Sequence, residues 1–252
     1  MTFEIGLIFS GIIISTIAIA IGIGGGILWM PLLLIVYKLN PQEAITTSLF
    51  IQVIGMSSGS VAYYRAGLVK SKLMFVLFLS AVPGVIIGSL LTVTMEEKSI
   101  QMAIGIMSIM LALLFVTGNT ETVANDNYNY NKSQVLRILP IPAFFGFILG
   151  SLSLGVGEWL IPALRQRLKL GMTASIATVI PMMLLLTILA SLIRFNYADT
   201  FHLKYFLYGA AGTIIGAQIG ATISKRINER ILKQSFIYLM TLVGIHLIFQ
   251  SI

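Results

Sequence analysis

The charge-free stretch over residues 5–37 decides the fold, because Gly22-Ile23-Gly24-Gly25-Gly26 interrupts its apolar run and Pro31 follows five residues later. As a single helix, this stretch would be about 50 Å long, whereas the hydrocarbon core of a bilayer is about 30 Å thick. Each glycine in a helix interior costs about 1 kcal/mol relative to alanine. We therefore predict a helix over 3–22, a non-helical turn at the glycines and a short helix over 27–37.

The composition places the whole chain in a membrane. Of its 252 residues, 57% are hydrophobic and 10% are charged, whereas a soluble domain carries about 25% charged residues. The net charge of +7 fits basic cytoplasmic loops better than a nucleic-acid surface. The chain has no cysteine, which excludes disulfides and thiolate metal sites. The acidic start, Met1-Thr2-Phe3-Glu4, predicts that no removable signal peptide is present.

Charge-free windows divide the rest of the chain into membrane-spanning lengths of about 20 residues. None of them alternates apolar and polar residues as a barrel strand does. The windows are 44–64, 73–95, 99–120, 138–157, 170–193, 205–224 and 234–252. We therefore predict an all-α polytopic membrane protein.

The two halves of the chain repeat. A polar linker over 118–137 separates a first transmembrane repeat over 1–117 from a second over 138–252. A shift of 131 positions keeps Gly, Pro and Lys in one register, in the pairs Gly24–Gly155, Gly26–Gly157, Pro31–Pro162 and Lys38–Lys169. Each repeat then holds about five helical segments, one of them a short helix after the Gly-rich break, which either crosses the membrane or re-enters it. The odd number of crossings predicts that the second repeat is inverted.

The basic residues predict the orientation of the chain. Three groups fall on one side in this scheme, namely Arg65/Lys70/Lys72, Arg165/Arg167/Lys169 and Lys225/Arg226/Arg230/Lys233. The positive-inside rule makes that side cytoplasmic and leaves both termini outside. Arg194 and Lys204 fall on the opposite side. We expect a multi-pass protein of the inner (cytoplasmic) membrane.

Inverted repeats with broken helices in matching positions indicate a secondary transporter with a central site. Broken helices are tolerated in a membrane where they line a cavity, and their N-terminal amides suit an anion. The candidate substrate-binding glycines are Gly24, Gly25, Gly26, Gly155 and Gly157. The alternative is that these glycines serve only close helix packing.

Neutral polar side chains supply further candidates for substrate binding. Thr47, Ser48 and Gln52 open the helix after the first break, and Thr178 holds a matching place in the second half. Their hydroxyls and amide can donate hydrogen bonds to an anion without the cost of burying a charge. The alternative is that they bond to carbonyls of their own helices.

Glu158 is a carboxylate at the start of the second short helix. A buried ionisable group of this kind is a candidate for proton coupling, and the alternative is a cap that interacts with the helix dipole. Arg194 lies at the end of its window, where an interfacial anchor is favoured over an anion ligand. His202 and His246 have no partners at metal-ligand spacing. No catalytic motif is present, and we predict neither an enzyme nor a bound metal or cofactor.

Three motifs resemble those of the sulfite exporter TauE/SafE family. They are Gly22-x-Gly24-Gly25-Gly26-x4-Pro31-Leu32, Asn40-Pro41-x2-Ala44-x2-Thr47-Ser48 and Pro83-Gly84-x3-Gly88. The resemblance covers essentially the whole chain and implies duplicated halves and transport of sulfite, thiosulfate or short organosulfonates. Where the family repeats a Gly-rich turn, the second half has Gly155-Val156-Gly157-Glu158-Trp159, which puts a simple two-fold anion clamp in doubt.

The sequence thus predicts a transporter of small sulfur-containing anions that works by alternating access, with proton coupling through Glu158 left open. An anion channel of the same architecture and a membrane-embedded accessory subunit are the alternatives. The expected partners are the small anionic substrate and the lipid bilayer, without nucleic acid. A homo-oligomer is compatible with the sequence.

Overall fold

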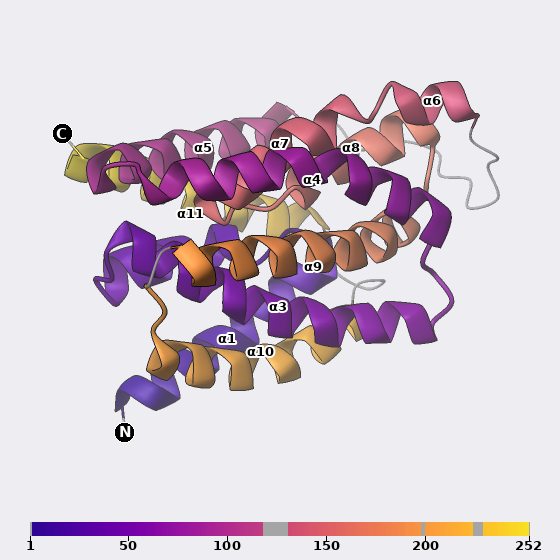
Figure 1. Ribbon diagram of the computed structural model, residues 1–252. Coiled ribbons are helices and arrows are strands. Elements are labelled where there is room, and N and C mark those ends of the chain that lie inside the picture. Colours follow the sequence, from indigo (N-terminus) through magenta and orange to yellow (C-terminus); the bar gives the residue numbers. More distant parts are fainter. Residues whose placement is uncertain (1, 118–130, 198–199, 224–228, 252) are drawn as a thin grey trace.

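The computed structural model describes residues 2–117, 131–197, 200–223 and 229–251, and the regular structure of these residues is entirely helical. In chain order the elements are α1 (Thr2–Ile21), α2 (Gly26–Pro31), the π-helix η1 (Leu32–Val36), α3 (Pro41–Arg65), α4 (Ser71–Val93), α5 (Glu97–Thr117), α6 (Lys132–Leu136), α7 (Pro140–Leu152), α8 (Gly157–Leu168), α9 (Met172–Tyr197), α10 (Leu203–Ile223) and α11 (Glu229–Ser251). Seven helical segments among the described residues are long and apolar enough to cross a membrane. The predicted class, an all-α polytopic membrane protein, is confirmed (Figure 1).

The predicted break in the first helix lies within one residue of its expected position. The helix α1 ends at Ile21, Gly22 adopts a φ of +76°, and α2 begins at Gly26. The left-handed backbone at Gly22 is accessible to glycine without a steric cost. The short helix does differ from the prediction, because it widens into the π-helix η1 directly after Pro31, which has no amide hydrogen to continue an α-helical ladder.

Both short helices turn back along the helix that precedes them, which favours the re-entrant alternative over a full crossing. The segment α2–η1 has 11 residues, which is about 16 Å of helix and roughly half of a bilayer core. It returns to the end where α1 begins, because Tyr37 packs edge-on against Phe3 with ring centroids 5.2 Å apart. In the second half, Arg167 at the end of α8 donates a hydrogen bond of 2.7 Å to the carbonyl of Arg137, which precedes α7.

The central pair of helices, α3 and α9, is antiparallel. At one end, Arg194 of α9 donates to Thr46 of α3, and at the other end the amide of Lys70 donates to Thr178. Figure 1 shows these two helices running side by side through the middle of the bundle. Equivalent helices of two inverted repeats must run in opposite directions, and this pair does.

The outer helices pack through glycines across the two halves. In the parallel pair α1–α10, Gly212 and Gly216 lie against the carbonyls of Ile8 and Ile12. The pair α4–α7 is likewise parallel and in close contact, with Gly88 against the carbonyl of Phe147. A side chain at any of these glycines would meet the backbone of the facing helix, which is how small residues allow membrane helices to approach.

Two matched pairs of left-handed residues lie 131 positions apart. The first pair is Gly22 and Ser153, with φ of 76° and 59°, and the second is Lys38 and Lys169, with φ of 54° and 52°. Each member of the second pair closes its short helix with the same bond, from Leu39 N to Leu33 O (3.0 Å) and from Leu170 N to Leu164 O (3.4 Å). These matches support the predicted duplication, although the inversion of the repeats and the bounds of the two domains stay a prediction.

Residues 118–130 of the predicted linker lie outside the described residues. Its last part is helical, since Asn131 starts α6 and its amide donates a hydrogen bond of 2.9 Å to the side chain of Gln134. The range Lys132–Leu152 forms one candidate span. Helical structure therefore begins at Lys132, six residues before the predicted start of the second repeat at residue 138. A polar first turn is compatible with this start, because polar side chains can cap the first amides of a helix.

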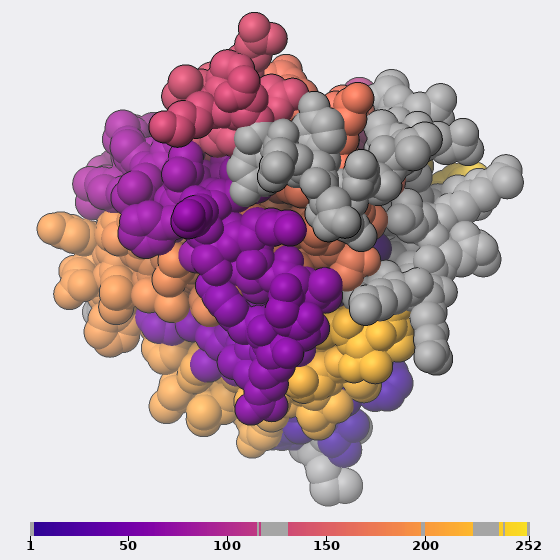
Figure 2. Space-filling model, turned by 90° about the vertical axis from the view of Figure 1, so that its right-hand side faces the viewer, coloured from indigo at the N-terminus to yellow at the C-terminus, as the bar shows by residue number. Residues whose placement is uncertain are grey.

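The described charges differ between the two ends of the bundle. At the end with the α3–α4 and α8–α9 connections, which Figure 2 faces, cations outnumber acids among the described residues. The cations are Arg65, Lys70, Lys72, Lys132, Arg137, Arg165, Arg167 and Lys169, and Glu229 begins α11 at the same end. The opposite end, where α1 begins, mixes both signs, with Glu4, Glu43, Glu96 and Glu97 beside its cations.

Candidate functional site

The two Gly-rich turns meet inside the bundle. A methyl group placed on Gly24 would lie 3.1 Å from the Cα of Gly155, and one on Gly157 would overlap the carbonyl oxygen of Gly22. A methyl group on Gly26 would overlap the carbonyl oxygen of Ser153. Four of the five predicted glycines, Gly24, Gly26, Gly155 and Gly157, are therefore brought together from opposite halves, in direct backbone contact.

Gly25 differs from its two neighbours. A methyl group on Gly25 would lie 3.5 Å from Trp29 and 3.6 Å from Ala18, which are ordinary van der Waals distances. Its backbone, with φ −30° and ψ −14°, is helical. The structure therefore gives no steric reason for glycine at this position, whereas Gly24 and Gly26 have one.

A buried polar cluster lies against the first turn and consists of Ser48, Gln52 and Ser153. The amide nitrogen of Gln52 donates to the hydroxyl of Ser153 at 2.7 Å and to the hydroxyl of Ser48 at 3.1 Å. The Ser153 hydroxyl in turn donates to the Ser48 hydroxyl at 3.1 Å. All three side chains are buried, and the side-chain amide oxygen of Gln52 (Oε1) has no hydrogen-bond partner. This cluster joins α3 of the first half to the turn of the second half.

Sequence spacing explains how α3 presents the cluster. Asn40 caps the helix by accepting from the amide of Glu43 at 2.9 Å, and Pro41 fills the first turn, where an amide hydrogen is not needed. Ser48 and Gln52 are four residues apart and lie on one face of the helix. The position that matches Gln52 in the second half is Met183, whose methyl group contacts Gly24 and Gly155. The two halves therefore present an amide and a thioether to the same turns.

The predicted hydroxyls Thr47 and Thr178 have different surroundings. Thr47 is fully buried, and its hydroxyl oxygen has no hydrogen-bond partner. Thr178 donates to the carbonyl of Ala174 at 2.8 Å and accepts from the amide of Lys70 at 3.2 Å. The bonds of Thr178 thus hold α9 and the α3–α4 connection rather than the Gln52 cluster, in line with the helix-bonding alternative for this residue.

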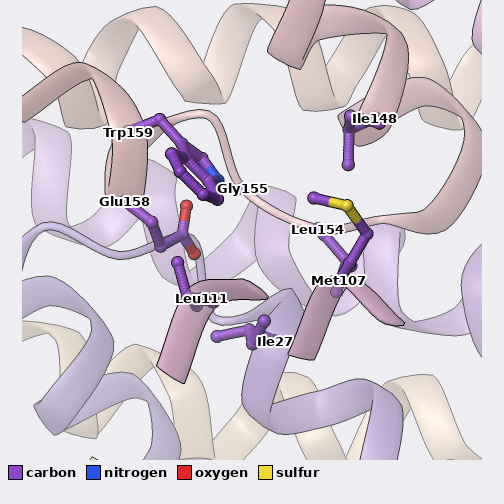
Figure 3. A pocket seen from close by; sticks show the side chains of 8 residues that line it. All are labelled: Ile27, Met107, Leu111, Ile148, Leu154, Gly155, Glu158 and Trp159. Atoms are coloured by element: carbon purple, nitrogen blue, oxygen red, sulfur yellow. The ribbon is translucent and has the colours of Figure 1, made fainter. Parts of the chain in front are cut away.

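Glu158 lies at the start of α8 and is 3% exposed. Neither carboxyl oxygen makes a hydrogen bond of ordinary geometry, although the backbone amides of Gly24 and of Glu158 itself are close enough to act on it electrostatically. The carboxyl group borders a small cavity with otherwise apolar walls (Figure 3) and room for about one water molecule. These walls are formed by Ile27, Met107, Leu111, Ile148, Leu154, Gly155 and Trp159.

Arg194 is fully buried, so the expectation that it is an interfacial anchor is wrong. Its Nε donates to the hydroxyl of Thr46 at 3.0 Å, and its Nη2 donates to the backbone carbonyl of Gln42 at 3.3 Å and to the side-chain carbonyl of the same residue. The nearby carboxylate of Glu43 instead pairs with His202 at 2.9 Å. Arg194 thereby joins the end of α9 to the first turn of α3.

Sequence reasoning did not identify Ser153 or Arg194 as parts of buried polar clusters. Ser153 matches Gly22 in the repeat register, and this match was the available signal for a left-handed residue at the second turn. The partners of Arg194 lie 148 and 152 positions away in sequence, and local spacing carries no signal at that distance.

The arrangement of membrane-length helices around two re-entrant breaks defines a polytopic α-helical membrane protein of the transporter type. The chain belongs to the sulfite exporter TauE/SafE family, whose sequence model matches residues 7–247. This confirms the family resemblance.

Two relatives from Bacillus subtilis (strain 168) are similar over nearly their whole length. "Probable membrane transporter protein YunE" is 25% identical over 279 residues, covering 100% of this chain and 99% of the relative. "Probable membrane transporter protein YjnA" is 25% identical over 258 residues, covering 97% and 100%. No solved structure matches the chain.

Proposed function

We propose that this protein is a secondary transporter that moves sulfite, thiosulfate or short organosulfonates across the cytoplasmic membrane by alternating access. The observation that carries the proposal is the contact of the two Gly-rich turns beside a buried polar cluster. The family supports the substrate class. The small anionic substrate and the lipid bilayer are the partners, and no reaction chemistry is assigned to the protein.

The substrate would bind where the two turns meet, between Gln52 and Ser48 on one side and the backbone of Gly24, Gly26, Gly155 and Gly157 on the other. Hydroxyl and amide hydrogens can bond sulfite or sulfonate oxygens without bringing a fixed cation into the membrane. Thr47, whose hydroxyl is buried without a partner, is available to join them once the turns separate. Thr178 contributes through the packing of α9, whereas the side of Gly25 where a methyl group would lie faces Trp29 and Ala18 of its own half.

The conformation described is closed around this site. The glycines are in direct contact, and the cavity beside Glu158 has room for about one water, which is too small for an oxyanion. Transport therefore requires the two turns to move apart, alternately toward each end of the bundle. Rocking of two repeats around a fixed central site is the usual form of such a cycle.

The charges support an orientation and a coupling site. The end that carries Arg65, Lys70 and Lys72 together with Arg165, Arg167 and Lys169 faces the cytoplasm by the positive-inside rule, which leaves both termini outside. Glu158 is the described carboxylate at the central turns, and it couples proton movement to the anion in this proposal. Protonated Glu158 would not repel an anion bound at the neighbouring turn, which gives proton–anion symport a physical basis.

Thermal unfolding of the purified protein in detergent tests the proposal. Sulfite, thiosulfate, taurine and sulfoacetate are compared with sulfate and chloride, and a ligand at 100 times its Kd adds about 2.7 kcal/mol to the free energy of unfolding. We expect stabilisation by at least one of the first four that is lost in Gln52→Leu and retained in Gln218→Leu, which changes an exposed amide on α10. If none of these four anions stabilises the wild-type protein, the proposed substrate class is refuted.

A further inference from the structure

A second buried polar group lies far from the glycine turns, at the end of the bundle where α9 ends and α3 begins. Arg194 is 0% exposed in the last turn of α9. Its Nε and Nη2 atoms donate three hydrogen bonds to neutral oxygen atoms of Thr46 and Gln42. Its Nη1 atom is buried and has no hydrogen-bond partner. The guanidinium is therefore held in a fixed orientation, and the hydrogens of its Nη1 atom make no hydrogen bond.

The charge of Arg194 is not balanced by the neighbouring acid. Glu43 lies one residue from Gln42, but its carboxylate accepts from the backbone amide of Asn40 at 3.1 Å and pairs with His202 at 2.9 Å. An arginine in a protein keeps its charge. Within the part of the chain that the structure describes, no carboxylate pairs with Arg194. A buried charge without a partner of opposite sign is strongly unfavourable, so this position favours the binding of an anion.

The neighbouring backbone and hydroxyls add to this preference. Gln42 lies in the first turn of α3, and that end of a 25-residue helix carries the positive end of its dipole. The hydroxyl of Thr200 lies 2.9 Å from the hydroxyl of Thr46 beside the guanidinium, and the Thr46 hydroxyl itself donates to the backbone carbonyl of Gln42 at 3.0 Å. Cation, helix end and hydroxyls are together the groups that bind oxyanions.

We infer that Arg194, with the hydroxyl of Thr200, forms a second binding site for a small oxyanion, separate from the glycine turns. The free edge of the guanidinium supplies the ligand contact, and the bonds to Gln42 and Thr46 orient it. In the orientation proposed above, the site lies one helical turn from the outer end of the bundle, on the path of an anion that enters or leaves there. The site itself does not depend on transport being the function.

Equilibrium binding of radiolabelled sulfate to the purified full-length protein in detergent tests this inference. We expect saturable binding in the wild type and at least about a tenfold increase in Kd in Arg194→Gln, because charge-assisted hydrogen bonds are lost. Arg65→Gln is the matched control, since it removes an exposed arginine from the last turn of α3 and should leave Kd unchanged. Arg194→Lys should give an intermediate Kd, because lysine keeps the charge without the planar fork.

Further arms keep the test decisive. Thr46→Val keeps the charge of Arg194 but removes the hydroxyl that orients its Nε, so sulfate should bind more weakly than in the wild type and more tightly than in Arg194→Gln; binding as weak as in Arg194→Gln would overturn the assignment of the ligand contact to the guanidinium. Added phosphatidylglycerol should not compete with sulfate, because a buried guanidinium is not accessible to a lipid headgroup; competition would overturn the assignment to a free anion.

An unchanged Kd in Arg194→Gln, or no sulfate binding in the wild type, would overturn the site. Sulfate binding that is lost in Gln52→Leu but kept in Arg194→Gln would overturn it too, while leaving the central site intact.

Discussion

Gly25 and Gly26 are adjacent, and replacing each with alanine should give opposite results. In Gly26→Ala, the new methyl group overlaps the carbonyl oxygen of Ser153 and lies 2.8 Å from the amide nitrogen of Gln52. In Gly25→Ala, the nearest atom is 3.5 Å away, in Trp29. The two variants add the same group to the same turn, so any difference between them comes from the contact between the two halves.

The magnitude follows from the displaced contacts. Overpacking against backbone costs about 1–3 kcal/mol, and loss of the Gln52–Ser153 hydrogen bond adds about 0.5–1.5 kcal/mol. We therefore expect Gly26→Ala to lower the free energy of unfolding by about 2–4 kcal/mol, which is roughly 4–16 °C in Tm for a chain of this size. Gly25→Ala should stay within about 0.5 kcal/mol of wild type, because its backbone is already helical.

Thermal unfolding in detergent measures the stability of both variants, and anion transport in proteoliposomes measures their function. Gly26→Ala should lose most transport activity, because the two turns can no longer close on each other, whereas Gly25→Ala should retain it. Equal melting temperatures and equal transport rates in the two variants would refute the contact between the turns.

Glu158→Gln should flatten the pH profile of transport, while Glu97→Gln, at the first residue of α5, should not; a retained profile would leave Glu158 as a structural cap. Ser153→Gly keeps the left-handed backbone but removes the hydroxyl that bonds Gln52 and Ser48, so thermal melts should show a loss of about 1–2 kcal/mol, and an unchanged Tm would contradict a stabilising cluster. Gly212→Ala should cost about 1–3 kcal/mol because its methyl group meets the carbonyl of Ile8; the exposed Ala211→Val should change stability by less than about 0.5 kcal/mol, and equal effects would argue against the close α1–α10 contact.

The sequence predicts the break points well because their causes are local. Length, glycine and proline decide where a membrane helix must stop, and α1 and the combined segment α2–η1 begin and end within one residue of the predicted ranges 3–22 and 27–37. The membrane class was equally accessible, since it depends on composition and window length alone. The repeat register of 131 positions also relates residues with the same left-handed backbone, such as Lys38 and Lys169.

The side-chain contacts of the site could not be predicted because they join residues far apart in the chain. Gln52 was identified as a candidate, but its bond to Ser153 spans 101 positions. Arg194 was expected at the membrane interface, where basic residues usually gather, yet neutral partners on α3 hold it inside the bundle. Glycine is required at position 26 and not at position 25 because only Gly26 contacts the opposite turn, and the sequence of the first turn carries no signal for that contact.

The most direct test of the central claim is solute counterflow of radiolabelled thiosulfate in proteoliposomes loaded with unlabelled thiosulfate. A carrier that alternates access around one site gives a transient accumulation of label above equilibrium, which a channel does not. The account predicts this overshoot in the wild type, its inhibition by sulfite but not by chloride, and its loss in Gln52→Leu. Simple equilibration without overshoot, or an overshoot that Gln52→Leu leaves unchanged, would contradict the account.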